Sequence, residues 1–258
     1  MVFKESPVTT LNIWLVGASS GIGLELLKRW LQEGHNVVAS SRSAQSSTKL
    51  LELQSIYFDR LVLLDLDVSI SQDCSPIIEQ AWSAFGNLDR WFYNAGAYDV
   101  LKQENWEVEK FEMMMQTNYM GAVRLMIPLS TYFTAQGYGE WIWNSSLSSY
   151  FGLPYGGAYS APKAALVNLA ESIQPELKAK GINLRIINHG FVKTRLTQKN
   201  SFTMPQLMEP HDAAQHIADA LEQERGFEIR FPKFLTFVLA LIRFIPYSWS
   251  LRLTQKAL

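Results

Sequence analysis

Residues 11–23 of the chain read LNIWLVGASSGIG, an apolar run followed at once by a glycine-rich turn. The run has the length and composition of a buried strand. Gly17, Gly21 and Gly23 let the backbone turn tightly and come close to an anion, while a helix that begins at Gly21 directs its free N–H groups toward that anion. The stretch therefore predicts a strand, a phosphate-binding turn that also contains Ser19, Ser20 and Ile22, and a helix. A merely flexible turn is the alternative.

The same alternation of strand and helix continues along the chain. After the first helix at 21–33, apolar runs predict strands at 36–40, 61–66, 88–94, 141–145, 182–188 and 228–231. Helical patterns fall between them at 71–85, 107–118, 120–136, 159–180 and 211–224, and residues 198–209 are expected to form a mobile loop. This alternation predicts the α/β class: a doubly wound, mainly parallel sheet with helices on both faces, in a Rossmann-type three-layer sandwich.

Composition limits the class of protein. With 258 residues, 48% of them hydrophobic, and no linker rich in Pro, Gly or Ser, the chain is expected to form a single domain, 1–258. A net charge of −1 gives no field that would attract nucleic acid. Cys74 is the single cysteine, which is typical of a reducing compartment, and the four histidines lack metal-ligand spacing. We therefore expect a cytoplasmic protein without a metal, a signal peptide or a spanning helix.

A tyrosine and a lysine near the start of the 159–180 helix have the spacing of an acid–base pair. Tyr159 and Lys163 are four residues apart, so they share one helical face. A free tyrosine has a pKa of about 10, too high for a base near neutrality, but an ammonium and the positive end of a helix both favour the phenolate. An ordinary surface tyrosine and lysine is the alternative for this pair taken alone.

Five motifs in one order resemble the short-chain dehydrogenase/reductase family, in its compact single-domain branch. They are the glycine turn, Asn94-Ala95-Gly96, Asn118, Ser146 and the Tyr159/Lys163 pair. The resemblance covers residues 8–231 and leaves 232–258 as an apolar C-terminal helical extension. It implies an oxidoreductase that transfers a hydride between a nicotinamide cofactor and a carbonyl or secondary alcohol substrate.

The resemblance also implies a role for each matching residue. Tyr159 is expected to be the general acid in reduction and the base in oxidation, while Lys163 lowers the pKa of Tyr159 and holds the nicotinamide ribose. Ser146 is expected to bind the substrate oxygen, and Asn118 to anchor a water that relays protons to Lys163. The remaining cofactor contacts are expected from Asp67 and Val68 at the adenine, from Asn94, Ala95 and Gly96 along the cofactor, and from Gly190, Val192 and Thr194 at the nicotinamide carboxamide.

Three positions depart from the family pattern without removing a catalytic group. Val16 replaces the threonine that usually precedes the glycine turn, and Tyr93 replaces the first asparagine of the usual pair. His189 replaces the proline before Gly190, which predicts a more mobile loop after it.

The end of the 36–40 strand bears on the choice of cofactor. In the family, an acid here receives the adenine ribose 2′-hydroxyl of NAD, but this chain has Ser41, followed by Arg42 and Ser43. A guanidinium pairs well with a 2′-phosphate, and small hydroxyl residues leave room for it. We therefore expect NADP(H) to be favoured over NAD(H). A solvated loop arginine is the alternative.

Apolar residues gather in two further segments. One set predicts an apolar substrate pocket or simple core packing: Tyr150, Phe151, Leu153, Pro154, Tyr155, Phe202, Met204 and Met208. A second set shares a helical face opposite Thr236 and Arg243: Phe234, Phe237, Val238, Leu241, Ile242 and Ile245. Basic residues flank it at Arg230, Lys233, Arg252 and Lys256. We expect residues 234–258 to pack over the substrate side or in a homo-oligomer, a dimer or tetramer; a peripheral membrane contact is the alternative.

The sequence thus predicts NADP(H)-dependent carbonyl reduction or alcohol oxidation on a small, apolar substrate. Two other classes stay open: a cofactor-binding regulatory protein without turnover, and a membrane-associated scaffold that uses the C-terminal helix. The intact Ser146, Tyr159 and Lys163 argue against the first of these.

Overall fold

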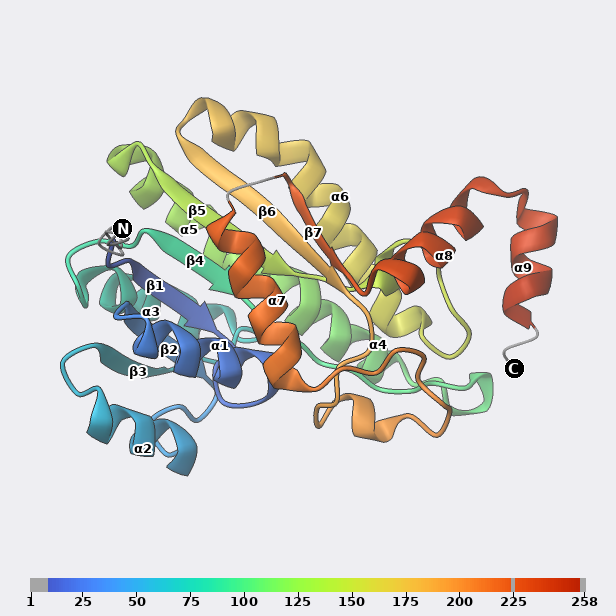
Figure 1. The fold of residues 1–258 in the computed structure, drawn as a ribbon, viewed down its shortest axis with the longest axis horizontal. Coiled ribbons are helices and arrows are strands. Elements are labelled where there is room, and N and C mark those ends of the chain that lie inside the picture. The colour runs from blue at the N-terminus through green and yellow to red at the C-terminus, as the bar shows by residue number, and fades with distance from the viewer. Residues whose placement is uncertain (1–8, 224–225, 256–258) are drawn as a thin grey trace, which may run out of the picture.

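A single parallel sheet organises the computed structural model, which describes residues 9–223 and 226–255. Its seven strands lie in the order β3-β2-β1-β4-β5-β6-β7 (Figure 1). Strands β1 to β7 span Asn12–Val16, Asn36–Ser41, Leu61–Asp65, Arg90–Tyr93, Gly139–Asn144, Ile182–His189 and Glu228–Phe231. Every pair of neighbours is parallel, so the predicted α/β class and doubly wound sheet are confirmed.

Helices cover both faces of the sheet. Helices α1 to α9 span Gly21–Gln32, Thr48–Ile56, Ser71–Ser83, Val108–Met115, Gly121–Gln136, Gly157–Ala179, Pro210–Glu222, Lys233–Phe244 and Tyr247–Gln255. Helices α1 and α7 pack on one face, and α3, α5 and α6 on the other (Figure 1). In β1, Ile13 and Leu15 enter the first of these cores, while Trp14 and Val16 enter the second. Because such a strand is buried on both faces, it reads as a continuous apolar run.

The order of the strands places a crevice at the carboxyl end of β1. From β1 the chain moves to β2 and β3 on one side, and then returns to β4 on the other side of β1. In open sheets of this kind, ligands bind at the carboxyl ends of the strands where the order reverses. The glycine turn follows β1 and Asn94-Ala95-Gly96 follows β4, so both lie at this point.

Two elements differ from the sequence-based expectation. Helix α2 was not predicted, because among its residues only Leu50 is buried and its pattern is therefore weakly amphipathic. The two helices expected at 107–118 and 120–136 are joined by a π-helical turn, Gln116–Met120, which contains Asn118. The helix expected at 211–224 ends at Glu222, and residue 224 lies outside the described residues.

The C-terminal extension consists of two helices instead of one, because α8 ends before Ile245-Pro246 and α9 begins at Tyr247. In α8 the buried residues are Thr236 and Leu239, whereas Phe234 and Phe237 are exposed. The expected apolar face is therefore divided: Val238, Ile242 and Ile245 are half-buried, whereas Phe234, Phe237 and Leu241 are exposed, and what these exposed residues contact stays a prediction. Lys256 lies outside the described residues, and the expected homo-oligomer stays a prediction.

Candidate active site

The glycine turn after β1 has a geometry that only glycine satisfies. Gly17 and Gly21 have φ values of +95° and +57°. A Cβ atom on Gly17 would lie 2.7 Å from the backbone nitrogen of Ala95, and one on Gly23 would lie 2.1 Å from the carbonyl oxygen of Gly17. Ser20 begins α1 without capping it through its side chain. The first N–H groups of α1 are therefore left for an anion at the turn, as expected for a phosphate-binding site.

Asn94 connects the turn to the neighbouring strands. Its Nδ2 donates to the carbonyl oxygen of Gly17 at 2.8 Å, and its Oδ1 accepts from Nδ2 of Asn144 at 2.7 Å. One side chain thus joins the carboxyl ends of β1, β4 and β5, which agrees with the expected supporting role. Gly96 passes close to Asn118, since a Cβ atom on this glycine would lie 3.4 Å from Asn118 Oδ1.

Asn118 is fully buried and is held by backbone on the far side of the site. Its Oδ1 accepts from the Ala97 N–H at 2.8 Å, and its Nδ2 donates to the Ala97 carbonyl at 2.8 Å. Both ends of the amide are thus used, so the side chain fixes the loop after β4. Any proton relay through Asn118 would have to use its backbone carbonyl, and that role stays a prediction.

Tyr93, which departs from the family pattern, supports the same π-helical turn. Its hydroxyl donates to the carbonyl of Thr117 at 2.5 Å, and its ring is fully buried. A Cβ atom on Gly121 would lie 2.3 Å from that hydroxyl oxygen, so the close contact needs a glycine. π-Helical turns leave backbone groups without their usual helical partners. The Tyr93 hydroxyl satisfies one of these groups directly beside Asn118.

Ser146, Tyr159 and Lys163 come together beyond the end of β5. Ser146 follows β5 and is nearly buried; its hydroxyl accepts from the Ser148 N–H at 3.2 Å and interacts with the Tyr159 side chain, which lowers the pKa of that tyrosine. Tyr159 lies in the first turn of α6, as predicted, and Lys163 is one turn farther along. The Lys163 ammonium donates to the carbonyl of Asn144 at 2.7 Å and lies 5.7 Å from the centre of the Tyr159 ring.

Burial dominates the proton affinities of this pair. It raises the pKa of Tyr159 to about 12, although the hydrogen bond with Ser146 acts in the opposite direction. Burial also lowers the pKa of Lys163 to about 7. Lys163 is thus only partly charged near neutrality when only the protein's own groups act, and its expected lowering of the Tyr159 pKa stays a prediction. The phenol accordingly keeps its proton at neutral pH.

Two residues that the sequence-based reasoning missed cover Tyr159. The Tyr98 ring packs edge-on against the Tyr159 ring with 5.0 Å between their centres. The Tyr98 hydroxyl donates to Oδ1 of Asn200 at 2.6 Å. Tyr98 follows the Asn94-Ala95-Gly96 motif by two residues, which is the only signal in the sequence that could have pointed to it. Asn200 has no such signal, because 102 positions separate it from Tyr98.

The end of β2 shows two groups without partners. Ser41 has a buried hydroxyl that makes no hydrogen bond. Arg42 is exposed, and within residues 9–223 and 226–255 it has no ion-pair or hydrogen-bond partner. Asp67 and Val68 follow β3 at the same edge, where the Asp67 carboxylate accepts from the N–H and hydroxyl of Ser69 at 2.9 and 2.6 Å. Val68 is buried.

The loop after β6 covers the glycine turn. A Cβ atom on Gly21 would lie 2.9 Å from the Thr194 methyl group, and Arg195 donates to the Ser20 hydroxyl at 3.1 Å. Arg195 was not predicted as a site residue. Of the other residues expected here, Val192 is buried and forms a bridge with Met208, and Gly190 N–H donates to the carbonyl of Phe231 at 2.9 Å.

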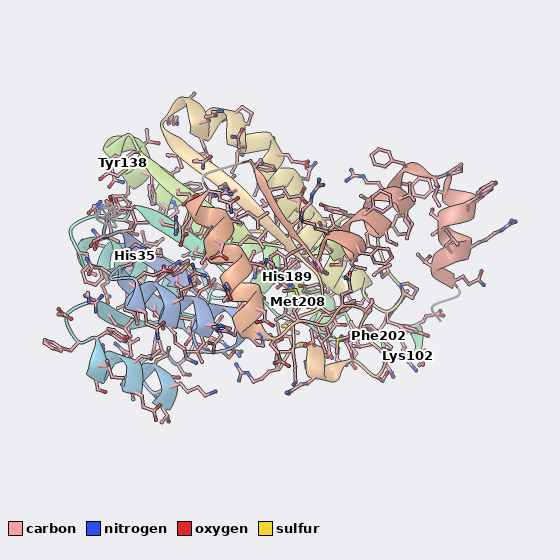
Figure 2. The ribbon with its side chains drawn as sticks, in the orientation of Figure 1. His35, Lys102, Tyr138, His189, Phe202 and Met208 are labelled. Carbon is pink, nitrogen blue, oxygen red and sulfur yellow. The ribbon has the colours of Figure 1, made fainter. Side chains whose placement is uncertain are left out.

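His189 lies in the last position of β6, paired with Phe231 of β7 (Figure 2). Its Nδ1 is 2.7 Å from the carbonyl oxygen of Gly190 and therefore donates to it. Burial, with a smaller contribution from the nearby Lys163, lowers the pKa of His189 to about 4 against the opposing effect of the Gly190 hydrogen bond, so the ring is neutral at pH 7. The replacement of proline is thus accommodated by strand pairing and by this hydrogen bond. The expected mobility of the following loop stays a prediction.

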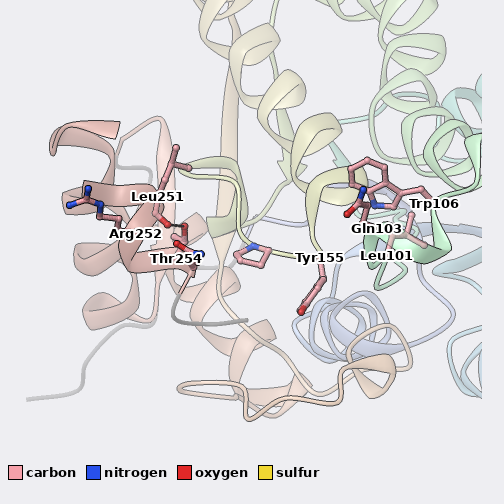
Figure 3. A pocket seen from close by; sticks show the side chains of 9 residues that line it. Leu101, Gln103, Trp106, Tyr155, Leu251, Arg252 and Thr254 are labelled. Carbon is pink, nitrogen blue, oxygen red and sulfur yellow. Dashed lines mark hydrogen bonds between the residues drawn. The ribbon is translucent and has the colours of Figure 1, made fainter. Parts of the chain in front are cut away.

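An apolar cavity opens beside the site, between the loops that precede α4 and α6 on one side and α9 on the other (Figure 3). Its volume is about 530 Å³, and its walls are Leu101, Gln103, Trp106, Pro154, Tyr155, Leu251, Arg252, Thr254 and Gln255. Of the residues expected to form an apolar pocket, Pro154 and Tyr155 line this cavity. Met208 packs against the core instead, and Phe202 packs edge-on against Phe191 (Figure 2).

Metal ions in proteins are held by groups of ligand side chains such as His, Cys, Asp and Glu. Among the residues that the structure describes, no group of three or more His, Cys, Asp or Glu side chains could hold a metal ion. The chemistry available at the site comes instead from a phenol, a hydroxyl and an ammonium beside a phosphate-binding turn. This set can bind a dinucleotide and exchange a proton with an oxygen atom next to it.

Comparisons with known proteins agree with the geometry. A family model described as short chain dehydrogenase matches residues 12–204. An uncharacterized oxidoreductase of Myxococcus xanthus is 28% identical over 232 residues, which cover 90% of this chain and 91% of that protein. The 11-beta-hydroxysteroid dehydrogenase A of Sesamum indicum is 28% identical over 186 residues, 71% of this chain and 53% of that protein. A short chain dehydrogenase structure from Burkholderia cenocepacia in complex with NADP has a TM-score of 0.82 at 20% identity and covers 96% of this chain and 99% of its own.

Proposed function

The chain belongs to the short-chain dehydrogenase family and is an NAD(P)-dependent oxidoreductase acting on CH–OH or C=O groups, and from that premise we propose its cofactor, acid–base residue and substrate class. It uses NADP(H), acts on an apolar carbonyl compound or the corresponding secondary alcohol, and exchanges the proton through Tyr159. The observation that carries this proposal is the convergence of Ser146, Tyr159 and Lys163 beside the glycine turn.

The residues around the turn fit a dinucleotide. The closely packed glycines at 17, 21 and 23 and the uncapped start of α1 form a cradle for a pyrophosphate. The buried Ser41 hydroxyl without a partner would gain one from the adenine ribose, and Lys163 would hold the nicotinamide ribose. When bound, the cofactor supplies or accepts the hydride.

The protein's own groups manage the proton. Because the pKa of Tyr159 is about 12, its hydroxyl carries a proton at neutral pH and can donate it to a developing alkoxide in the direction of reduction. The Ser146 hydroxyl, which already bonds Tyr159, is placed to donate to the same oxygen. In oxidation the phenol must lose this proton first. A charged Lys163 beside it would favour that loss, and the protonated phenol of the free site is the form that reduction uses.

Arg42 supports the choice of NADP(H), and Arg195 supports the binding of either cofactor. Arg42 has a free guanidinium next to Ser41, where an acid would select NAD(H). Arg195 lies over Ser20 at the start of α1 and adds a second positive charge near the phosphates. Two solved structures with this fold carry NADP in their descriptions, the Burkholderia cenocepacia enzyme and ElxO, at 20% and 24% identity.

The cavity beside α9 favours an apolar substrate. Leu101, Trp106, Pro154, Tyr155 and Leu251 dominate its walls. One relative is named 11-beta-hydroxysteroid dehydrogenase A. We assign an apolar ketone or secondary alcohol to this cavity on the strength of the side chains that line it.

Turnover by a panel of ketones, aldehydes and secondary alcohols with NADPH and NADH tests the proposal. Tyr159→Phe is expected to remove turnover and leave NADPH binding nearly unchanged, because the phosphate and ribose contacts lie elsewhere. Lys163→Ala is expected to damage both. Near-normal turnover by Tyr159→Phe would overturn the mechanism. Tight NADPH binding with no turnover on any substrate of the panel would instead favour the regulatory protein without catalysis.

A further inference from the structure

Helices α8 and α9 expose a large apolar surface. It consists of Phe234, Phe237, Leu241, Phe244, Tyr247, Trp249, Leu251 and Leu253, which we call the C-terminal apolar surface. Each of these side chains is more than half exposed, and Phe244 reaches 84%. Figure 1 shows the two helices projecting from one end of the sheet. Soluble monomers rarely expose contiguous apolar patches of this kind without a binding role.

Both helices leave most of their large apolar side chains exposed. In α8, Thr236 and Leu239 face the body of the protein, while Phe234, Phe237, Leu241 and Phe244 recur every three or four residues on an exposed face. In α9, the two buried residues are Ser250 and Thr254. Threonine and serine therefore account for three of the four buried residues of these helices, beside Leu239, and the large aromatic residues are left for something outside the chain.

The charges around this surface have one sign. No aspartate or glutamate follows Glu228 in the sequence, whereas Lys233, Arg243 and Arg252 lie within α8 and α9. Arg230, which precedes them, is paired with Glu228 at 3.6 Å. The other three have no ion-pair or hydrogen-bond partner among the residues that the structure covers. The cationic groups are thus available to an anionic partner.

A second copy of the chain is a poor match for this surface. In a twofold-symmetric dimer the same patch faces itself, so the unpaired Lys233, Arg243 and Arg252 would meet their own counterparts with no acid in the segment to balance them. An anionic lipid surface is complementary in both respects. Its acyl region accepts aromatic and aliphatic side chains, and its headgroups attract lysine and arginine.

We propose that α8 and α9 form a peripheral docking element for anionic lipid membranes. Exposed Tyr247 and Trp249 have the amphipathic rings that favour the water–lipid boundary. The helices lie in that boundary instead of crossing it: in the part of the chain that the structure describes, no helix is both long and apolar enough to span a bilayer. Leu251 belongs to the surface and also lines the cavity beside α9, so docking places the cavity at the membrane.

Vesicle co-sedimentation of the full-length protein tests this proposal without any measurement of turnover. The protein is expected to bind vesicles that contain phosphatidylglycerol more tightly than phosphatidylcholine vesicles, and salt should weaken the binding. Arg243→Glu should weaken it at least about fivefold, since each basic residue near an anionic surface contributes a factor of about that size. The double variant F237D/F244D should lose binding, because it places two carboxylates in the apolar surface.

Matched variants control for general effects of charge and folding. Phe58→Asp alters a phenylalanine that is 80% exposed elsewhere in the molecule, and Lys49→Glu reverses an exposed charge on α2; both should bind vesicles like the unaltered protein. Light scattering after gel filtration, without lipid, measures the oligomeric state of each variant. Three outcomes would overturn the proposal: no binding of the unaltered protein to anionic vesicles at low salt, retained binding by F237D/F244D, or dissociation of an oligomer by F237D/F244D, which would identify the surface as a contact between copies.

Discussion

At the scale of single residues, Arg42 and Arg195 separate the selectivity for NADP(H) from the general affinity for either cofactor. In the proposed function, Arg42 follows Ser41, the position at which a 2′-phosphate would be distinguished from a hydroxyl, while Arg195 bonds Ser20 at the start of α1, near the phosphates that both cofactors share. An arginine–phosphate pair contributes on the order of 1.5–3 kcal/mol. We expect Arg42→Ala to weaken NADPH binding about tenfold or more and barely change NADH binding. Arg195→Ala should weaken both about equally, as measured by fluorescence titration. Equal losses for the two cofactors in Arg42→Ala would mean that this arginine acts structurally.

Lys163 makes a prediction about stability and pH. Its pKa falls from 10.5 to about 7 on folding, so between these values the unfolded chain binds a proton that the folded chain lacks. The free energy of unfolding should therefore rise with pH across this window, by at most about 1.4 kcal/mol per pH unit. Lys163→Met lacks this contribution. Denaturant unfolding of both proteins without cofactor between pH 7.5 and 9.5 should show a steeper rise for the unaltered protein, and parallel curves would contradict the buried lysine.

At the scale of elements, the π-helical turn between α4 and α5 is held by Tyr93. Removing its hydroxyl leaves the Thr117 carbonyl without a partner beside Asn118. We expect Tyr93→Phe to lower the free energy of unfolding by about 1–3 kcal/mol. It should also lower kcat while the KM for the cofactor changes little. Tyr132→Phe on α5 is a control, since that hydroxyl has no hydrogen-bond partner among the described residues. An unchanged kcat in Tyr93→Phe would show that the turn supports folding alone.

The elements that the sequence predicts well are those with a local signal. Strands buried on both faces appear as apolar runs, and the glycine turn shows its close contacts through Gly17 and Gly23. The cover over Tyr159 has no such signal, because Tyr98 and Asn200 meet only through the folded chain. Helix α2 was missed because it buries so little. The pKa of Tyr159 also depends on its burial, and the four-residue spacing of Tyr159 and Lys163 gives no information about burial.

At the scale of the whole molecule, the sequence of the C-terminal extension predicts which residues share a helix face, but it does not predict what that face contacts. Of the predicted apolar face, Phe234, Phe237 and Leu241 are exposed and the rest is half-buried, while Thr236 on the opposite side is buried. A hydrophobic pattern shows which residues share a face, but it does not show whether that face meets the protein's own core or an external partner. In this chain the unpaired Lys233, Arg243 and Arg252 distinguish the two cases.

The proposed docking and the proposed activity together predict that lipid affects turnover in a substrate-dependent way. The cavity beside α9 shares Leu251 with the C-terminal apolar surface, so a substrate dissolved in the bilayer meets the cavity without crossing bulk water. Confining enzyme and substrate to one surface raises their effective concentration. We expect phosphatidylglycerol vesicles to raise kcat/KM for a long-chain ketone about tenfold and to leave a short, water-soluble ketone unaffected.

The same variants separate the two proposals on which this prediction rests. F237D/F244D should keep its activity on the short ketone and lose the stimulation by vesicles, whereas Phe58→Asp should keep both. Loss of activity on the short ketone in Tyr159→Phe alone concerns catalysis and leaves docking untouched. The double variant alters only residues that would contact lipid. If vesicles stimulate it as strongly as the unaltered protein, the C-terminal apolar surface does not deliver the substrate.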